Sequence, residues 1–411
     1  MWRFASESLV RARREYRTGI SYWRALSLPG PAATPLAGDA TCEVAVVGGG
    51  ISGALTALLL VREGRDTLLV DQAELAAEST AASTGLLQYE IDTPLVDLIA
   101  KVGEADAVHA YRRGLTAIDE LESLTESLPD RCGFERVPSL YRASSRWHLR
   151  RLRREAECRQ SFGIDVEFLN REALREKQVD APGALWSPRD GQVDPYRFTC
   201  QLLHEARRLG LRMHNQTEIT RVERLPQQVE LTTANGKITA QHVVYATGYA
   251  VQQFVGHRVG RLRSTYVLTS QPLQATQGWP ERCLIWETAR PYFYARQTGD
   301  GRAMIGGEDT SFATDHKRDG LVARQVNRLL ARAKQILPAI DIEPEFAWAG
   351  TFGETKDGMA FIGCLPERPR EYFSIGFGGN GITFAMIAAR TITDLVMGRP
   401  NRDAEVFRLR R

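Results

Sequence analysis

The sequence predicts a mixed α/β fold divided into two domains, and three observations support this prediction. The chain has 411 residues, which is more than one simple hydrophobic core usually holds. A strand, a glycine-rich loop and a helix are expected in succession over residues 42–64. A second glycine-rich loop, over residues 376–381, again leads into an apolar helical segment. The composition, 43% hydrophobic and 25% charged, is that of an ordinary globular protein.

Residues 1–40 are expected to form an N-terminal arm and a linker. Four arginines, Arg11, Arg13, Arg14 and Arg17, make the first part a candidate basic helix. We interpret it as a solvated terminal helix, and the alternative is a weak peripheral contact with a membrane or a partner. No apolar segment follows these charges, so a secretory signal is not expected. The longest apolar run, Ala54–Val61, is far shorter than the roughly 20 residues that span a bilayer, so no transmembrane segment is expected.

One β-α-β unit follows the linker. The apolar, β-branched run Cys42–Val47 is typical of a buried parallel strand. A helix is expected from Ile51 to about Glu63, with Gly64 as its C-terminal cap. The next strand, Thr67–Val70, ends at Asp71.

The remainder of the chain alternates helical and strand patterns. Helices are expected over residues 96–128, 144–160, 194–210 and 321–337, and strands over 218–223, 229–233, 237–250 and parts of 262–306. The arginine-rich stretch 146–159 interleaves basic with apolar and acidic residues, which favours an amphipathic helix with a solvated basic face. Because the net charge is only +3, we expect no nucleic-acid partner.

Cysteines and histidines give no sign of a metal site. The six cysteines are Cys42, Cys132, Cys158, Cys200, Cys283 and Cys364, and none has C-x-x-C spacing. They are typical of reduced thiols, which predicts a cytoplasmic protein. The histidines considered are His109, His148 and His242, and we interpret them as structural because they lack metal-ligand spacing.

The first glycine loop, VVGGGISG, has the spacing of a dinucleotide site. Gly48 permits a tight turn, Gly50 lets backbone amides approach a pyrophosphate, and Gly53 lets the helix pack closely on the strand. Ile51 and Ser52 open the helix. An acid at the end of the second strand, here Asp71, is where a ribose hydroxyl is bound. Flavin and nicotinamide proteins share these features, so this motif leaves the two open.

Three distant segments favour flavin. VVYATG over residues 243–248 ends a strand with a small-residue turn, STAASTGLLQYEID over 79–92 can wrap a diphosphate, and GFGGNGITF over 376–384 supplies further amides. Besides the residues of the first loop and Asp71, the cofactor-binding candidates are Gln72, Ser79, Thr80, Ser83, Thr84, Gly85, Leu86, Leu87, Gln88, Ala246, Thr247, Gly248, Gly376, Gly378, Gly379, Asn380, Gly381, Ile382 and Thr383.

Together these motifs resemble the D-amino acid oxidase (DAO) family of flavoproteins, which includes glycine, sarcosine and γ-glutamylputrescine oxidases. The resemblance covers about residues 41–398, and further echoes are IGGED at 305–309 and TKDGMAFIG at 355–363. SYWRALSLPG and PLAGD, near the N-terminus, look most like the γ-glutamylputrescine oxidase-type members.

The resemblance implies a Rossmann-like FAD-binding domain and a smaller mixed-sheet substrate domain, each built from several segments. The implied ranges are 41–95, 192–258 and 346–411 for the FAD-binding domain, and 96–191 and 259–345 for the substrate domain. The implied reaction is oxidation of the C–N bond of a small primary or secondary amine or amino acid to an imine. Hydride would pass to flavin N5, so the cofactor supplies the difficult chemistry.

Two departures from the family pattern concern the stretch WAGTFGETKDG. Members similar to glycine oxidase carry a carboxylate-binding arginine where this chain has Phe352. Its absence favours an amine, or an acid held elsewhere, over a simple α-amino acid. Sarcosine oxidase-like members attach FAD through a cysteine in the same stretch, which here reads Thr351-Phe352-Gly353. Cys364 does not match that position, so we expect non-covalent FAD.

The stretch PYFYARQTGDGR is the candidate substrate strand. Tyr292 and Arg296 match the family's Tyr-x-x-x-Arg pattern, and Tyr294 alternates onto the same strand face as Tyr292. Arg263 and Tyr266 are weaker candidates. The alternatives are a flavin dehydrogenase of a hydroxy acid or polyol, and a non-catalytic FAD-binding protein that presents its basic N-terminus to a partner. The sequence does not predict the oligomeric state.

Overall fold

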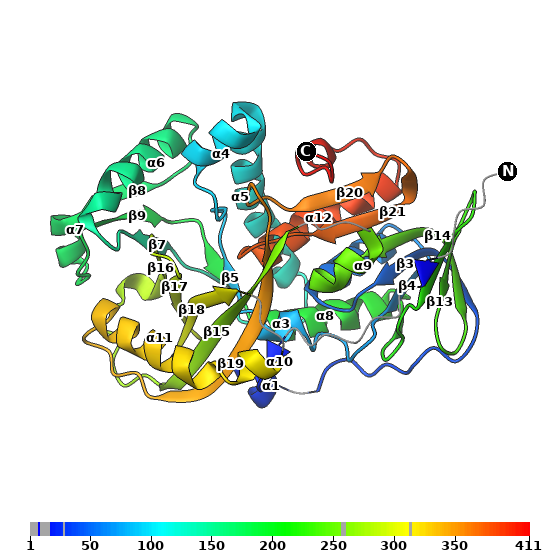
Figure 1. Cartoon of the computed structure of the whole chain (residues 1–411), viewed down its shortest axis with the longest axis horizontal. Coiled ribbons are helices and arrows are strands. Elements are labelled where there is room, and N and C mark those ends of the chain that lie inside the picture. The colour runs from blue at the N-terminus through cyan, green and yellow to red at the C-terminus, as the bar shows by residue number, and fades with distance from the viewer. Residues whose placement is uncertain (1–6, 9–16, 28, 256–259, 312–314) are drawn as a thin grey trace.

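The computed structural model describes residues 7–8, 17–27, 29–255, 260–311 and 315–411. Two large sheets carry the fold, and Figure 1 shows them on opposite sides of the molecule. One contains β3, β4 and β14, and the other contains β15 to β19.

The first sheet is built around the predicted β-α-β unit. Its strand order is β1-β12-β13-β14-β3-β4-β11, and β21 pairs with both β14 and β20. The strands are β1 (Glu7–Ser8), β3 (Ala40–Val47), β4 (Thr67–Val70), β11 (Arg212–His214), β12 (Arg221–Arg224), β13 (Val229–Thr232), β14 (Lys237–Tyr245), β20 (Phe361–Leu365) and β21 (Arg368–Ile375). Strands β14, β3, β4 and β11 run parallel, as does β21 beside β14. The carboxyl ends of β3, β14 and β21 therefore meet at one edge of the sheet, where ligands bind in open α/β folds.

Helices cover this sheet with one apolar core. The helices α2 (Ile51–Arg62), α8 (Pro195–Arg208) and α12 (Gly381–Val396) pack together, and α5 (Glu104–Glu126) packs on α12. The side chains of α2 from Ala54 to Val61 are almost all buried, which is why this helix has no polar face. The chain ends with α13 (Asp403–Val406), which contacts α12 and β20.

The second sheet has the order β2-β19-β15-β18-β17-β16-β7-β9-β8. Its strands are β2 (Arg17–Thr18), β7 (Ser139–Arg142), β8 (Glu167–Asn170), β9 (Gly183–Ser187), β15 (Arg261–Pro272), β16 (Leu284–Glu287), β17 (Phe293–Gln297), β18 (Arg302–Ser311) and β19 (Pro344–Glu354). The helix α11 (Val322–Ile336) packs on β15, β18 and β19, and α6 (Leu149–Ser161) packs on β8 and β9. A small third sheet joins β5 (Leu86–Leu87), β10 (Gly191–Gln192) and β6 (Glu135–Arg136).

The other elements are short. They are α1 (Tyr22–Leu26), α3 (Ser79–Ala82), α4 (Leu95–Val102), α7 (Arg171–Glu176), α9 (Gln252–Val255), α10 (Asp315–Asp319), and the 3-10 turns η1 (Arg146–His148), η2 (Gly248–Val251) and η3 (Pro280–Arg282). The helices predicted over 194–210 and 321–337 are confirmed as α8 and α11. Asp194 caps α8 by accepting a hydrogen bond from the Arg197 amide at 2.9 Å.

Four expectations need correction. The helix predicted over 96–128 is two helices, α4 and α5, because Gly103 has a φ of 88° and breaks the chain direction. The strand predicted over 218–223 begins only at Arg221. The described parts of the predicted N-terminal helix are the short strands β1 and β2, paired with β12 and β19. Residues 9–16, with Arg11, Arg13 and Arg14, lie outside the described residues.

The fourth correction concerns the arginine-rich helix α6, whose basic face is not wholly solvated. Arg159 is 1% exposed and forms ion pairs with Glu155 at 2.7 Å and Glu90 at 3.2 Å. Glu155 in turn accepts the amides of Leu95 and Val96 at the start of α4. The buried charges thus join α6 to the segment from Glu90 to Val96, which is distant from it in the sequence.

Within the described part of the chain, no helix is both long and apolar enough to cross a bilayer. The same residues contain no group of three or more histidines, cysteines or acids placed to hold a metal ion.

Candidate functional site

A cavity of about 300 Å³ lies between loops of the first sheet and strands of the second. The predicted residues that line it are Gly48, Gly50, Ile51, Ser52, Asp71, Gln72, Ser79, Thr80, Ser83, Thr84, Leu86, Gln88, Ala246, Thr247, Gly248, Tyr292, Tyr294, Gly376, Gly378, Gly379, Asn380, Gly381 and Ile382. Five predicted residues do not line it: Gly53, Gly85, Leu87, Thr383 and Arg296.

The first glycine loop has the geometry of a phosphate cradle. Gly48 has a φ of 114°, and a Cβ there would collide with the carbonyl oxygen of Ala246 in the VVYATG turn. A Cβ at Gly53 would strike the Gly48 carbonyl, so this glycine serves helix packing and not the cavity wall. No side chain caps α2 at Gly50, so its positive N-terminal end is left for an anion.

Asp71 braces this loop from the end of β4. Its carboxylate accepts the Gly49 amide at 2.6 Å and the Ala73 amide at 2.7 Å. The loop also touches the second predicted segment, because the Ile51 amide donates to the Thr80 hydroxyl at 2.9 Å.

The loops at 79–92 and 376–384 are joined to each other. Asn380 donates to the Gln88 carbonyl oxygen at 3.0 Å, and the Gly379 amide donates to Asp92 at 3.0 Å. Thr383 also bonds the Gln88 carbonyl, from behind the wall. The segments that the sequence suggested for one ligand therefore form one continuous surface.

The residues present fit a long polar cofactor. Several residues of the cavity wall hold buried polar atoms without a hydrogen-bond partner in the described chain: Gln88 Nε2, Thr247 Oγ1, Trp286 Nε1 and Ser374 Oγ. Buried polar groups are nearly always paired, so such a set indicates a ligand that supplies the missing partners. The uncapped α2 and the glycine cradle add sites for its phosphates.

The other end of the cavity is aromatic. Tyr249, Trp286, Tyr292, Tyr294 and Phe352 line it. The IGGED motif explains how the tyrosines fit: Gly306 lies opposite Tyr294 in the β17–β18 ladder, and a Cβ there would enter the Tyr294 ring. Tyr249 and Trp286 carried no signal in the sequence that separates them from ordinary core aromatics.

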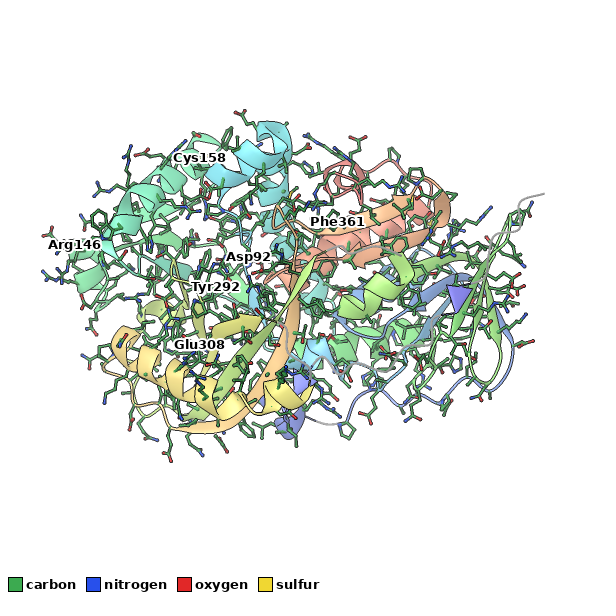
Figure 2. The ribbon with its side chains drawn as sticks, viewed as in Figure 1. Asp92, Arg146, Cys158, Tyr292, Glu308 and Phe361 are labelled. Atoms are coloured by element: carbon green, nitrogen blue, oxygen red, sulfur yellow. The ribbon has the colours of Figure 1, made fainter. Side chains whose placement is uncertain are left out.

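Two acids, Asp92 and Asp309, line the aromatic end of the cavity, and the sequence analysis did not select either as a site residue. Figure 2 shows Asp92 and Tyr292 near the centre of the molecule. The pKa of Asp309 is raised to about 6, mainly by burial, with a smaller contribution from Asp92, while a hydrogen bond with Thr265 and the charge of Arg290 oppose the rise. Burial also raises the pKa of Asp92, against the Gly379 hydrogen bond. Both acids stand at the end of a motif that was selected, STAASTGLLQYEID and IGGED.

The charged side chains of the cavity wall are all acidic among the described residues. Seven acids line the cavity: Asp71, Glu74, Glu78, Glu90, Asp92, Glu218 and Asp309. No lysine, arginine or histidine of the described residues does so. A substrate carboxylate therefore has no cation to bind in the wall itself, and Phe352 stands within that wall.

The structure does not bring Arg296 to the cavity as a substrate contact. Its Nη1 donates to the carbonyl oxygens of Thr84, Gly85 and Val193 at 3.0, 3.0 and 2.9 Å. The side chain is 2% exposed, and burial lowers its pKa to about 10. Arg296 thus holds the loop that carries Thr84, and its Nη1 is already engaged by three carbonyl oxygens.

The weaker candidates are also occupied elsewhere. Arg263 is paired with Glu354 at 2.9 Å, and the Tyr266 hydroxyl bonds Thr310 at 3.1 Å in the core. His109 is bound to Asp403 at 2.6 Å, and His148 to Thr288 at the same distance. Burial lowers the pKa of His242, which packs near Tyr372.

Comparisons with known proteins identify the family of the chain. The family model for FAD-dependent oxidoreductases (DAO) matches residues 43–395. A glycine oxidase of Bacillus subtilis is 26% identical over 383 residues, which cover 90% of this chain and 97% of that protein. The gamma-glutamylputrescine oxidoreductase of Escherichia coli is 26% identical over 381 residues, covering 89% and 85%.

Solved structures show the same fold. Glycine oxidase from Geobacillus kaustophilus superposes with a TM-score of 0.76 at 22% identity, covering 90% of this chain and 99% of that one. L-Amino acid deaminase from Proteus myxofaciens, in complex with anthranilate, gives a TM-score of 0.78 at 15% identity, covering 96% and 98%. The family match spans most of the chain and includes every loop of the cavity, and the chain belongs to the DAO family of FAD-dependent oxidoreductases.

Proposed function

We propose that this oxidoreductase oxidises the C–N bond of a small primary or secondary amine to an imine. The observation that carries the proposal is the charge of the cavity wall, which has acids but no cationic side chain among the described residues. A cationic amine is attracted to such a wall, whereas a hydroxy acid or a simple α-amino acid brings a carboxylate that the wall repels. The relatives named for glycine and γ-glutamylputrescine oxidation support a nitrogen compound as substrate.

The protein residues bind and orient the amine. The rings of Tyr292 and Tyr294 form apolar walls that also favour a cation over their faces. Asp309 attracts the ammonium group, and its carboxylate is the acceptor for the proton that the amine must lose before oxidation. The buried, water-poor setting favours the neutral amine that results. FAD, when bound, supplies the acceptor for the hydride from the carbon next to nitrogen.

We also propose that FAD is held without a covalent bond. Thr351 and Phe352 line the cavity, and no cysteine of the described chain does. Cys364, the nearest in sequence, lies on β20 outside the wall. Acid precipitation of the purified yellow protein should release FAD into the supernatant. Flavin that stays with the precipitate would contradict non-covalent binding.

The experiment that tests the reaction is anaerobic reduction of the bound flavin. Alkylamines, N-methyl amino acids, D-amino acids and hydroxy acids are mixed with the protein, and loss of flavin absorption is followed. We expect amines to bleach the flavin and hydroxy acids to leave it oxidised. Bleaching by hydroxy acids alone would assign the protein to the dehydrogenases of hydroxy acids or polyols, and bleaching by no compound would support a non-catalytic flavoprotein.

Two variants connect the assay to the cavity. Tyr292→Phe tests a side chain of the aromatic end. Tyr141→Phe is its control because Tyr141 stacks on the wall residue Trp286 but does not itself line the cavity. We expect Tyr292→Phe to slow reduction by amines while FAD content is unchanged. Equal rates in the two variants would remove the Tyr292 hydroxyl from the substrate site.

A further inference from the structure

Arg290 lies at the edge of the aromatic end of the cavity. Its Cζ is 3.3 Å from the centre of the Tyr292 ring, and Tyr292 lines the cavity. The side chain is exposed, and within the described chain it forms no hydrogen bond or ion pair. Its positive charge is close enough to Asp92 and Asp309 to lower the pKa of both carboxyl groups. Arg290 is thus a cation with free hydrogen-bond donors, and it lies beside a cavity whose described wall contains no cationic side chain.

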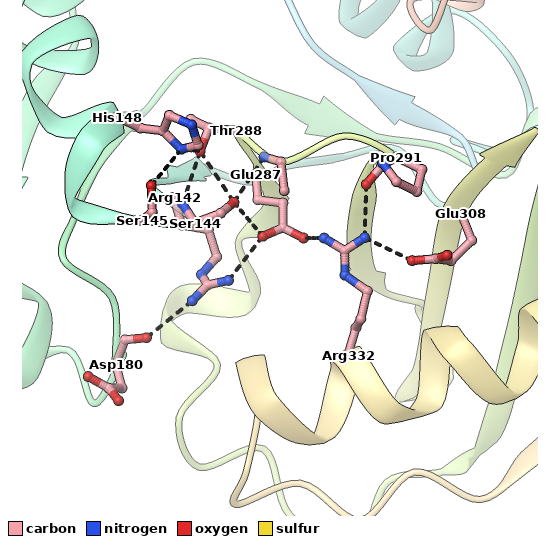
Figure 3. Close-up of polar contacts among 11 residues, drawn as sticks. Arg142, Ser144, Ser145, His148, Asp180, Glu287, Thr288, Pro291, Glu308 and Arg332 are labelled. Carbon is pink, nitrogen blue, oxygen red and sulfur yellow. Dashed lines mark hydrogen bonds and ion pairs between the residues drawn. The ribbon is translucent and has the colours of Figure 1, made fainter.

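The backbone around Arg290 is held on both sides, as Figure 3 shows for Pro291. The Ala289 amide donates to the Ser144 hydroxyl at 2.9 Å, and Arg332 donates to the Pro291 carbonyl oxygen at 2.8 Å. The Tyr292 carbonyl oxygen accepts the Glu308 amide at 2.8 Å. These bonds leave the guanidinium as the part of Arg290 that is free to bind.

Glu287 organises this support. Its carboxylate, 2% exposed, pairs with Arg332 on α11 and with Arg142 at 3.2 Å, and it also accepts the Ser144 hydroxyl (Figure 3). Arg332 additionally pairs with Glu308 at 2.9 Å. A buried carboxylate with three donors fixes its neighbours tightly, so Arg290 is presented on a rigid platform.

The negative and positive charges therefore lie at different distances from the protein surface. Asp92 and Asp309 are half-buried and line the cavity, whereas Arg290 is exposed at its edge. We propose that the substrate is an amine that carries a carboxylate several bonds away, an ω-amino carboxylate, and that Arg290 binds this carboxylate. The assignment rests on the proposed amine oxidation. It also accounts for Phe352: the anion site has moved from the wall to the cavity edge.

A diamine fits this arrangement less well. Its second ammonium group would lie beside the Arg290 guanidinium, and these two positive charges would repel each other. A plain alkylamine would bind through the inner end only. The carboxylate, in contrast, matches the planar guanidinium, which can offer it two parallel donors.

The test compares four-carbon compounds that differ only at the outer end: butylamine, 1,4-diaminobutane and 4-aminobutanoate, with 5-aminopentanoate and 6-aminohexanoate to find the span. Anaerobic flavin reduction at increasing concentration gives a Kd and a limiting rate for each. We expect the best ω-amino carboxylate to have a Kd roughly 10- to 100-fold below that of butylamine, as for one charged hydrogen-bonded pair. Diaminobutane should not gain this advantage.

Variants locate the effect. Arg290→Ala should raise the Kd of the ω-amino carboxylate to that of butylamine. The variants are compared at pH 8, well above the Asp309 pKa of about 6, because loss of the Arg290 charge also raises that pKa. Arg290→Lys should recover part of the affinity, since the charge remains without the two-donor geometry. Arg150→Ala removes an exposed arginine from α6 and is the control. A structural defect at Arg290 would change butylamine and 4-aminobutanoate alike.

Titration calorimetry with pentanoate, which contains no C–N bond, separates this assignment from the proposed reaction. We expect weak binding to the holoenzyme that Arg290→Ala abolishes. If no amine reduces the flavin, amine oxidation fails, and the pentanoate titration still decides the role of Arg290. If amines react but 4-aminobutanoate and its longer homologues gain nothing over butylamine, or diaminobutane binds best, the carboxylate assignment is wrong.

Discussion

Arg296 donates a hydrogen bond to the carbonyl oxygen of Gly85 at 3.0 Å, so a residue expected to bind substrate binds the protein's own loop. The same nitrogen also bonds the Thr84 and Val193 carbonyls. Arg296→Ala should therefore lower the free energy of unfolding by about 2 kcal/mol, because buried carbonyls lose a charged donor. FAD should be held less tightly, since Thr84 lines the cavity.

Flavin saturation separates this role from substrate binding. At saturating FAD, Arg296→Ala should have the same Kd for amines as the wild type, measured by anaerobic reduction. A large rise in that Kd with normal unfolding and normal FAD affinity would return Arg296 to the substrate site.

Gly48 is the position at which a single methyl group should exclude FAD. Gly48→Ala forces a Cβ toward the Ala246 carbonyl and also strains a φ of 114°. Gly64→Ala is the matched control, because Gly64 has a φ of 75° but no atom within 4 Å of the added Cβ. The control should lose only about 1 kcal/mol of stability. Flavin absorbance of the purified proteins should fall for Gly48→Ala alone.

The pH dependence of amine oxidation should report Asp309. Burial raises its pKa to about 6, so the carboxylate that attracts a cationic amine forms as pH rises through that value. We expect kcat/KM for an amine to increase from pH 5 to pH 7, with a slope approaching tenfold per unit at the acidic end. Asp309→Asn should lack this limb, and Asp165→Asn, at an exposed site, should retain it.

The raised pKa of Asp309 also predicts how the stability of the protein changes with pH. The folded state holds the Asp309 proton more tightly than the unfolded state, so the carboxyl lowers stability as pH rises from about 4 to about 6. Asp309→Asn should consequently be no less stable than the wild type at pH 8. A marked loss of stability there would mean that the ionised carboxyl has a favourable partner.

Arg159 is expected to be the costliest arginine of α6. Arg159→Met leaves Glu90 and Glu155 without their buried cation and should lower the free energy of unfolding by about 3–5 kcal/mol. Arg154→Met, at an exposed position of the same helix, should change it by less than about 0.5 kcal/mol. Urea denaturation of both variants measures the difference. Similar midpoints would show that the buried pairs add little.

Local signals in the sequence were sufficient for the cofactor end of the site. Gly48, Gly53 and Asp71 lie within one β-α-β unit, whose spacing and apolar pattern prescribe the turn and the close packing directly. Small hydroxylated residues at 79–92 and a second glycine-rich loop at 376–384 extended this to two distant segments, and the family match confirmed the family itself.

The substrate end could not be derived in this way, because its chemistry comes from long-range pairing. Asp92 and Asp309 face one cavity only once the loop after β5 meets the end of β18. The family's Tyr-x-x-x-Arg pattern selected Arg296, and strand alternation added Tyr294 beside Tyr292. Neither shows that the carbonyls near Gly85 already occupy the guanidinium of Arg296. Arg159 was misjudged for the same reason: its partner Glu90 lies 69 residues away.

The acidic cavity wall also governs how fast substrates arrive. Seven acids line the cavity, and although Glu90 and Glu74 are paired with Arg159 and Arg24, the remaining acids favour positive ions, so amine association should slow as ionic strength rises. Arg290 adds a positive charge at the edge of this acidic cavity. We expect an approaching zwitterion to turn its ammonium group toward the acids and its carboxylate toward Arg290, so that it is oriented before it contacts the protein.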